Sequence, residues 1–234
     1  MEEQVVMVVG KEPEEQVVTI PNEININTLS SNAIEALLKN VKITEYSKAA
    51  ELTDIIKNRS ILIGDIDEDT GSIVDNFIRF WNVYDNERNT PIEKRTPIKI
   101  CIDSNGGDFL STLTIIDAIE NSATPVWTVN IGRAYSGGLF IMLAGHRRLA
   151  YKRSTFLFHE GSIGGDQGDA IKFQNYADHY KALRGVMKEL ILEKTKISEE
   201  EYSQREKDDW WFMVNKALEK GVIDEIATGT WNCE

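Results

Sequence analysis

The feature that most constrains the fold is an alternation, from Ala49 onward, of short β-branched runs with longer stretches of helical periodicity. Residues 60–63 are a short apolar run of strand length, and residues 98–103 alternate isoleucine with other residues, as a strand does. The residues between them, such as Phe77 and Trp81, recur at the spacing of one helix face. A strand followed by a helix and a second strand forms a βαβ unit with parallel strands. The sequence therefore predicts an α/β fold in which helices cover a mostly parallel sheet.

The same cycle continues toward the C-terminus. Helices are predicted at residues 109–119 and 137–144, with a strand at 127–131 between them, and two further β-rich runs follow at 149–151 and 155–158. In open α/β folds, functional groups gather at the carboxyl ends of the strands. We therefore expect the chemistry of the chain in the turns that follow these strands.

The longest predicted element is a helix over residues 168–195. Its apolar side chains recur at helical spacing and no proline interrupts them; they are Phe173, Tyr176, Ala177, Tyr180, Leu183, Met187, Leu190 and Ile191. At 1.5 Å per residue such a helix is roughly 40 Å long, more than a domain of this size needs internally. We expect part of it to protrude and to pack against another subunit.

The segment after this helix carries helix start and stop signals. Ser198 and Glu201 have the spacing of a capping box. Asp208 and Asp209 precede a second predicted helix, which is expected to end at Gly221.

The N-terminal residues differ from the rest of the chain in their residue pattern. Two β-branched runs at 5–9 and 17–20 are joined by a segment with glycine and proline, which is typical of a hairpin with a loose turn. We therefore divide the chain into an N-terminal appendage (1–45), hairpin-like or flexible, a main domain (46–228) and a C-terminal tail (229–234).

Composition excludes several classes of function. The chain has 38 acidic against 26 basic residues, and its formal charge of −12 repels phosphate backbones, so we expect no nucleic acid partner. The longest apolar stretch, residues 139–144, is far shorter than the roughly 18 residues of a spanning helix. Two cysteines, Cys101 and Cys233, make neither a disulfide framework nor a metal site. We expect a cytoplasmic protein without a membrane segment, metal or cofactor.

The first candidate site is the string Asp-Ser-Asn-Gly-Gly at residues 103–107, between a predicted strand and a predicted helix. Paired glycines let backbone N–H groups approach a ligand, and a helix N-terminus favours negative charge. The string suits the binding of an oxyanion, although Asn-Gly-Gly is also ordinary turn chemistry.

The second is Ser136, which precedes Gly137 and Gly138 at another strand-to-helix junction. A serine at this place is commonly a helix N-cap. It is equally suited to be a nucleophile, with the Gly137 N–H beside the atom that becomes negative after attack.

The third is His159, which closes the apolar run at 155–158. It is suited to take a proton from Ser136 if the two strand ends are neighbours. His146 lies in a basic cluster and His179 lies in the long helix, so we expect both to be solvated. A triad also needs an orienting carboxylate, which composition cannot choose among 38 acids.

In their order along the chain, these motifs resemble the proteolytic subunit of Clp proteases. The resemblance covers roughly residues 57–226 and includes Asn105-Gly106-Gly107, Ser136, His159, Asp209, and the final Gly221-Val222-Ile223-Asp224. It implies the α/β spiral of ββα units that this family shares with crotonases, with a long protruding helix.

The resemblance also implies a role for each matching residue. Ser136 matches the nucleophile, His159 the general base and Asp209 the carboxylate that orients the histidine, with Asp208 as the competing neighbour. Gly107 and Gly137 match the two oxyanion donors. Two segments are expected to pair with the substrate as an added β-strand. The first consists of Asp108, Phe109 and Leu110, and the second of Ile163, Gly164, Gly165 and Asp166.

The sequence departs from the family at each motif. Asn105 replaces a usual proline, Gly137 a methionine, and Glu160-Gly161 a Gln-Pro pair, while Trp210 follows Asp209 instead of a basic residue. These departures favour a divergent member, of the phage or plasmid type.

The function implied is that of a serine endopeptidase that degrades unfolded polypeptides by a Ser-His-Asp mechanism. The resemblance further implies a homo-oligomer of stacked heptameric rings and an AAA+ unfoldase, a Clp ATPase, as partner. One alternative is an inactive subunit that keeps the fold for structural or regulatory purposes. Others are a crotonase-like acyl-CoA enzyme, which an acidic surface suits poorly, and a membrane-linked Ser-Lys peptidase.

Overall fold

The computed structural model describes residues 6–9, 16–19, 54–159, 161 and 170–228. Its strands are β1 (Val6–Val9), β2 (Gln16–Thr19), β3 (Ser60–Ile63), β4 (Ile98–Ser104), β5 (Val126–Tyr135), β6 (Arg147–Ala150), β7 (Thr155–Phe158), β8 (Trp210–Met213) and β9 (Glu225–Ile226). Its helices are α3 (Glu68–Glu87), a 3-10 turn η2 (Ile92–Lys94), α4 (Phe109–Glu120), α5 (Gly137–Ala144), α6 (Ala170–Lys194), α7 (Glu199–Arg205) and α8 (Val214–Glu219). This is the predicted alternation of strands and helices.

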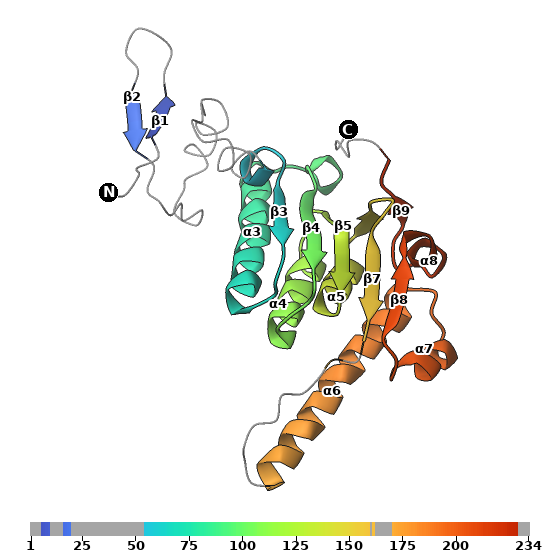
Figure 1. The fold of residues 1–234 in the computed structure, drawn as a ribbon. Helices are drawn as coiled ribbons and strands as arrows, with labels where there is room; N and C mark the ends of the chain where they lie inside the picture. The colour runs from blue at the N-terminus through green and yellow to red at the C-terminus, as the bar shows by residue number, and fades with distance from the viewer. Residues whose placement is uncertain (1–5, 10–15, 20–53, 160, 162–169, 229–234) are drawn as a thin grey trace.

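The main sheet is largely parallel and has seven strands (Figure 1). Five of them lie in the order β3-β4-β5-β6-β9, and each neighbouring pair in this row is parallel. Strand β5 has two partners on one side. Its residues 127–130 pair with β6, and its residues 133–135 pair with β7. The predicted α/β fold with a mostly parallel sheet is therefore confirmed.

Strand β8 is one element that the sequence analysis missed. Asp209 is followed by this strand, which pairs with β7 in the antiparallel direction, and only then by α8. The prediction of one continuous helix after Asp209 was therefore wrong. Trp210 and Phe212 face the core while Trp211 and Met213 are exposed, so both sides of the strand are apolar and no polar alternation marks it.

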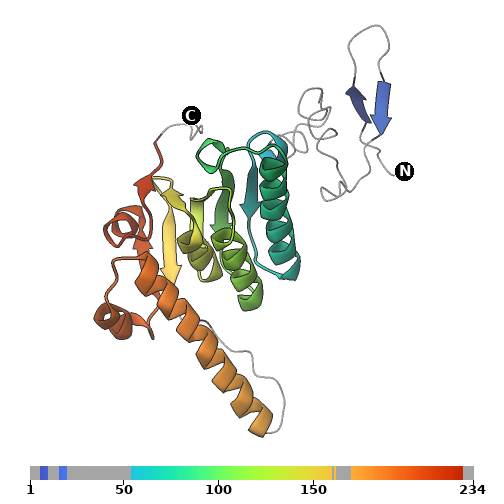
Figure 2. The same ribbon diagram turned by 180° about the vertical axis from the view of Figure 1, so that it is seen from behind.

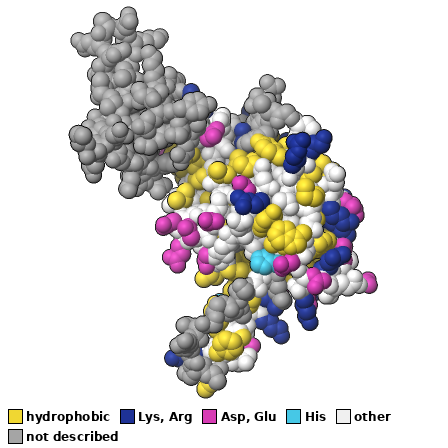
Figure 3. Space-filling view, in the orientation of Figure 1, with side chains coloured by type: hydrophobic (Ala, Val, Ile, Leu, Met, Phe, Trp, Pro, Cys, Tyr) yellow, Lys and Arg dark blue, Asp and Glu magenta, His cyan; other side chains and the backbone are white. Residues whose placement is uncertain are grey.

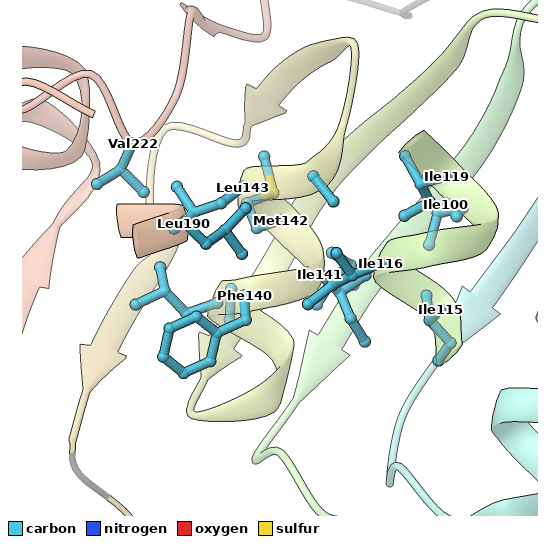
Figure 4. Close-up of a cluster of buried hydrophobic side chains, with 14 of the residues drawn as sticks. Ile100, Ile115, Ile116, Ile119, Phe140, Ile141, Met142, Leu143, Leu190 and Val222 are labelled. Carbon is cyan, nitrogen blue, oxygen red and sulfur yellow. The ribbon is translucent and has the colours of Figure 1, made fainter. Parts of the chain in front are cut away.

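Three helices cover one face of the sheet. Helix α4 contacts both α3 and α5, and Figures 1 and 2 show the three along the same side of the strands. Every residue of α5 is buried. Figure 4 shows Ile141 of α5 beside Ile116 of α4, and Leu143 beside Leu190 of α6. Helix α5 is thus the centre of the core, and it begins directly after Ser136.

Helix α6 has a buried end and a projecting end (Figures 1 and 3). Met187, Leu190 and Ile191 are buried in the core, whereas Phe173 and Tyr176 are each about half exposed. The prediction of a long protruding helix is confirmed. The last two turns of its apolar stripe pack within the chain, so only the earlier turns are left for the expected contact with another subunit.

Other predictions from sequence have different outcomes. β1 and β2 form an antiparallel pair from Val6 opposite Thr19 to Val9 opposite Gln16. The residues between them, the C-terminal tail, and the loop with Ile163, Gly164 and Gly165 lie outside the described residues. The division of the chain into three parts stays a prediction. Within the described residues, no helix is long and apolar enough to cross a membrane.

Candidate active site

Three parallel strands end at the same edge of the sheet, and a candidate residue follows each of them (Figure 1). The Gly106-Gly107 pair follows β4, Ser136 follows β5 and His159 follows β7. Strand β8 runs in the opposite direction and begins at this edge, directly after Asp209. The topology therefore brings the predicted site residues to one place.

Ser136 occupies a sharp turn between β5 and α5. Its backbone angles are φ 52° and ψ −122°, in a region that favours glycine. Its N–H donates to the Leu157 carbonyl oxygen of β7 at 3.0 Å, and its own carbonyl oxygen accepts from the Leu139 N–H at 2.9 Å. The Ser136 hydroxyl caps no amide of α5, although the residue has the N-cap position. Helix capping therefore does not explain why a serine occupies this position.

The Gly106-Gly107 turn lies directly against Ser136. Both glycines have a positive φ, of 99° and 155°. A Cβ on Gly106 would lie 2.7 Å from the Ser136 Cβ and 3.1 Å from its Oγ, and a Cβ on Gly107 would lie 2.0 Å from the Ile66 carbonyl oxygen. The Ile66 N–H donates to the Gly106 carbonyl oxygen at 3.2 Å, and the Ile66 carbonyl oxygen accepts from the Asp108 N–H at 2.7 Å. Ile66, which the sequence analysis did not identify, thus holds the turn in place.

Two backbone donors next to Ser136 are unused. Neither the Gly107 N–H nor the Gly137 N–H donates a hydrogen bond to any described residue. The Gly137 N–H belongs to the first turn of α5, where amides have no partner within the helix. A Cβ on Gly137 would lie 2.5 Å from Thr112 Oγ1, so the close approach of Thr112 requires a glycine at this position. The site therefore has donors that suit a negative oxygen.

The β7–β8 ladder sets His159 against Asp209. Its last pair joins Phe158 to Trp210, and the same antiparallel register, continued by one residue, places His159 opposite Asp209. Opposed residues of neighbouring strands have Cβ atoms about 5 Å apart. Asp208 falls one step further along, and its N–H donates to the Arg205 carbonyl oxygen at 2.9 Å. The register favours Asp209 over Asp208 as the partner of the histidine.

The side chains of Ser136, His159 and Asp209 come from the same edge of the sheet, but they are not hydrogen-bonded to one another. No hydrogen bond joins Ser136, His159 and Asp209 in the described part of the chain. His159 is half-buried and Asp209 is exposed. Catalytic hydrogen bonds are often long or poorly aligned without substrate. The missing bonds are therefore compatible with both an active and an inactive arrangement of these residues.

The expected substrate segment after the glycine turn is helical. Asp108 is the N-cap of α4, and its Oδ1 accepts from the Ser111 hydroxyl at 2.6 Å and from the Ser111 N–H at 2.7 Å, and both bonds lower the pKa of the carboxyl. Phe109 and Leu110 begin α4, so they offer no strand edge to a substrate, contrary to the expectation. Leu110 is exposed.

An ion pair unnoticed in the sequence also lies at this edge. Arg133 of β5 pairs with Asp103 of β4, with 2.8 Å between Nε and Oδ1. Hydrogen bonding from Arg133 lowers the pKa of the Asp103 carboxyl. No group of three or more potential metal ligands occurs among the described residues.

Comparison with known proteins agrees with this arrangement. The sequence model of the Clp protease family matches residues 50–230. The chain belongs to the Clp protease family. It is also 30% identical, over 132 residues, to the ATP-dependent Clp protease proteolytic subunit 2 of Treponema pallidum (strain Nichols). That alignment covers 56% of this chain and 66% of the relative, just under two thirds of its length.

Membership settles the fold class and the broad kind of protein. The parallel sheet covered by helices is consistent with the fold of Clp proteases, and the family supports a Clp-like peptidase over an acyl-CoA enzyme.

Proposed function

We propose that the chain is a serine endopeptidase subunit, with Ser136 as nucleophile, His159 as general base and Asp209 as the group that orients the histidine. The observation that carries the proposal is the position of Ser136, whose strained turn lies against the Gly106-Gly107 pair without capping α5. A serine used only for structure has no reason to keep this conformation, which costs of the order of 1–3 kcal/mol.

The mechanism follows from the groups at the edge. The Ser136 Oγ attacks the peptide carbonyl carbon while its proton passes to His159, and the tetrahedral oxyanion is stabilised by the Gly107 and Gly137 N–H groups. His159 then gives the proton to the leaving amine as the C–N bond breaks. Water attacks the acyl-enzyme by the same route in reverse and releases the new carboxyl end. Asp209 keeps the imidazole in the tautomer that accepts the proton.

Family membership supports the wider expectations. We propose a homo-oligomer of stacked heptameric rings that encloses the sites and takes unfolded polypeptides as substrates. An AAA+ unfoldase of the Clp ATPase type is the proposed partner, in accordance with the words "ATP-dependent" in the relative's name. The proposed location is the cytoplasm.

A fluorophosphonate probe tests the proposal directly. The intact protein should gain one adduct per chain, peptide mapping should place it on Ser136, and Ser136→Ala should gain none. A short fluorogenic peptide should be cleaved by the wild type alone. No adduct and no cleavage in the assembled protein would contradict the proposal.

A second reading is an inactive, structural subunit. The exposure of Asp209 and the missing hydrogen bonds among the three side chains favour it. The same probe separates the readings, because a structural subunit would keep its assembly but would not react with the fluorophosphonate.

A further inference from the structure

Strand β5 is irregular immediately before Ser136. Ile102 pairs with Asn130, but the next pair joins Ser104 to Ala134, so β5 advances four residues while β4 advances two. Such bulges leave backbone groups outside the ladder and redirect the strand that carries them. In this chain the bulge also separates the part of β5 that pairs with β6 from the part that pairs with β7.

Two side chains accept the hydrogen bonds of the amides in the bulge. The Gly132 N–H donates to Asn130 Oδ1 at 3.0 Å, and the Arg133 N–H donates to Asp103 Oδ1 at 3.2 Å. A Cβ on Gly132 would lie 2.8 Å from the same Asp103 oxygen, so the glycine makes room for the carboxylate. The Asp103 carboxylate therefore belongs to the structure of the bulge.

The Arg133 guanidinium extends this link to the glycine turn. Its Nε and Nη2 donate to the two Asp103 carboxylate oxygens at 2.8 and 3.4 Å, and its Nη1 donates to Asn105 Oδ1 at 3.3 Å. Asn105 directly precedes Gly106, which lies against the Ser136 side chain. One side chain thus joins the end of β4, the bulge of β5 and the start of the turn.

We propose that Arg133 is a positioning residue that fixes the Asn105–Gly106–Gly107 turn against Ser136. The proposal rests on the proposed function, because the turn carries one of the two oxyanion donors. Both partners of the ion pair are about 40% exposed, and ion pairs at such sites contribute little to the free energy of unfolding. The effect of Arg133 therefore falls on local geometry rather than on global stability.

Arg133→Gln tests this role, because it keeps a planar amide but removes the three-way contact. Since displacements of about 1 Å at a reacting group cost up to a hundredfold in rate, we expect kcat on a short fluorogenic peptide to fall about ten- to a hundredfold, with KM nearly unchanged. Arg133→Lys should behave like Arg133→Gln, because lysine keeps the charge without the fork. Full activity in either variant would overturn the proposal.

Arg147→Gln is a matched control. Arg147 also pairs with a carboxylate on this sheet, that of Glu225 at 2.5 Å, and its exposure is close to that of Arg133. It lies at the start of β6, opposite Trp127 near the other end of β5. Its substitution should leave kcat unchanged, and both glutamine variants should keep the melting temperature of the wild type.

Rescue by proline separates positioning from a direct charge effect. The φ of Asn105 is not positive and its N–H donates no hydrogen bond to a described residue, so proline at this position removes no backbone hydrogen bond. Asn105→Pro stiffens the turn independently of Arg133. In an Asn105→Pro background, Arg133→Gln should lower kcat by less than about twofold. A loss as large as in the wild-type background would overturn the proposal.

Hydrogen exchange keeps this test separate from that of the proposed function. Amides in residues 104–108 should exchange faster in Arg133→Gln than in the wild type or in Arg147→Gln. This result does not depend on activity. A wild type that neither cleaves peptide nor reacts with fluorophosphonate would contradict the proposed function, whereas unchanged exchange in Arg133→Gln would contradict the positioning role.

Discussion

At position 136 the backbone conformation and the residue type are opposed. A φ of 52° with a ψ of −122° suits glycine, yet the chain has a serine there. The neighbouring contacts maintain this conformation, since the Ser136 amide is bound to β7 and its carbonyl oxygen accepts from the first turn of α5. The hydroxyl is therefore presented at a cost to the free energy of folding.

Ser136→Gly and Ser136→Ala should separate function from stability. Both variants should lose peptide hydrolysis by about 10⁶ in kcat, because the nucleophile is absent. Ser136→Gly should be more stable than Ser136→Ala by about 1 kcal/mol, because glycine relieves the positive φ. Urea unfolding measures the difference. Equal stabilities would show that the turn is not strained, and residual hydrolysis would exclude Ser136 as the nucleophile.

Asp209→Asn and Asp208→Asn test the register of β8. Asp209→Asn should lower kcat by about 10⁴, because the amide no longer holds the tautomer of His159. Asp208→Asn should retain most of the activity. The opposite result would show that the ladder does not continue past Phe158 and Trp210 as its register implies.

His146 should make the free energy of unfolding depend on pH. Its Nδ1 accepts from the Val126 N–H at 2.9 Å, which a protonated ring cannot do. Partial desolvation of the ring lowers its pKa below the ordinary 6.5, and Lys194 acts in the same direction. A lowered pKa gives stability that is fully present above 6.5 and is lost as the pH falls through the folded-state value.

The melting temperature of wild type and His146→Asn checks this expectation. Between about pH 7.5 and about pH 5.5, the wild type should lose more of its melting temperature than His146→Asn, because asparagine does not titrate. Equal losses would assign the acid sensitivity to other groups.

At the scale of elements, β8 shows what the sequence could and could not predict. The turns after β4, β5 and β7 were found because each strand has a local apolar pattern that ends in glycine or a polar residue. Trp210 to Met213 carry no polar residue, so the strand could not be told from the start of a helix. Asp209 was therefore identified only by resemblance, and its place opposite His159 emerged from the ladder.

The contacts that hold the glycine turn were also beyond the sequence. Ile66 and Arg133 lie roughly 30 to 40 positions from the glycines they support, and nothing in their own neighbourhoods marks them. Their roles depend on which strands become neighbours. Local patterns therefore predicted the candidate residues, whereas the supporting residues required the structure.

Phe212→Ala should show how far β8 depends on the core. The Phe212 ring stacks on Phe156 with 5.4 Å between centroids, and both are buried. Its removal should cost about 3–5 kcal/mol of the free energy of unfolding, as is usual for a buried phenylalanine. Met213→Ala, on the exposed side of the same strand, should cost less than about 0.5 kcal/mol. Denaturant titration of the two variants measures both, and a similar cost for each would contradict the assigned faces of β8.

For the whole molecule, the projecting end of α6 is the surface most suited to assembly. Ile171, Phe173 and Tyr176 are at least half exposed there, so several large apolar side chains lie close together on a projecting helix. Tyr180 is different, because its ring contacts Phe109 at 6.2 Å between centroids within the same chain. The interface we propose therefore begins with the first turns of α6.

Tyr176→Asp should weaken the assembly without unfolding the chain. Light scattering should give the wild type a mass far above the 26.5 kDa of one chain, and the variant a smaller particle with lower peptidase activity. Met187→Asp serves as a contrast, because it buries a charge in the core and should unfold the protein instead. A wild-type monomer with full activity would contradict the assembly.

The antiparallel strand β8 also has a consequence for the order of synthesis. His159 lies at the end of β7, but the ladder that brings Asp209 to it extends to Met213, and the whole of α6 lies between the two strands in the sequence. On the ribosome, Ser136 and His159 are therefore made well before Asp209, their proposed acidic partner, can be placed. A nascent chain carries an incomplete site until most of the domain has been translated, so the proposed peptidase cannot act while it is still being made.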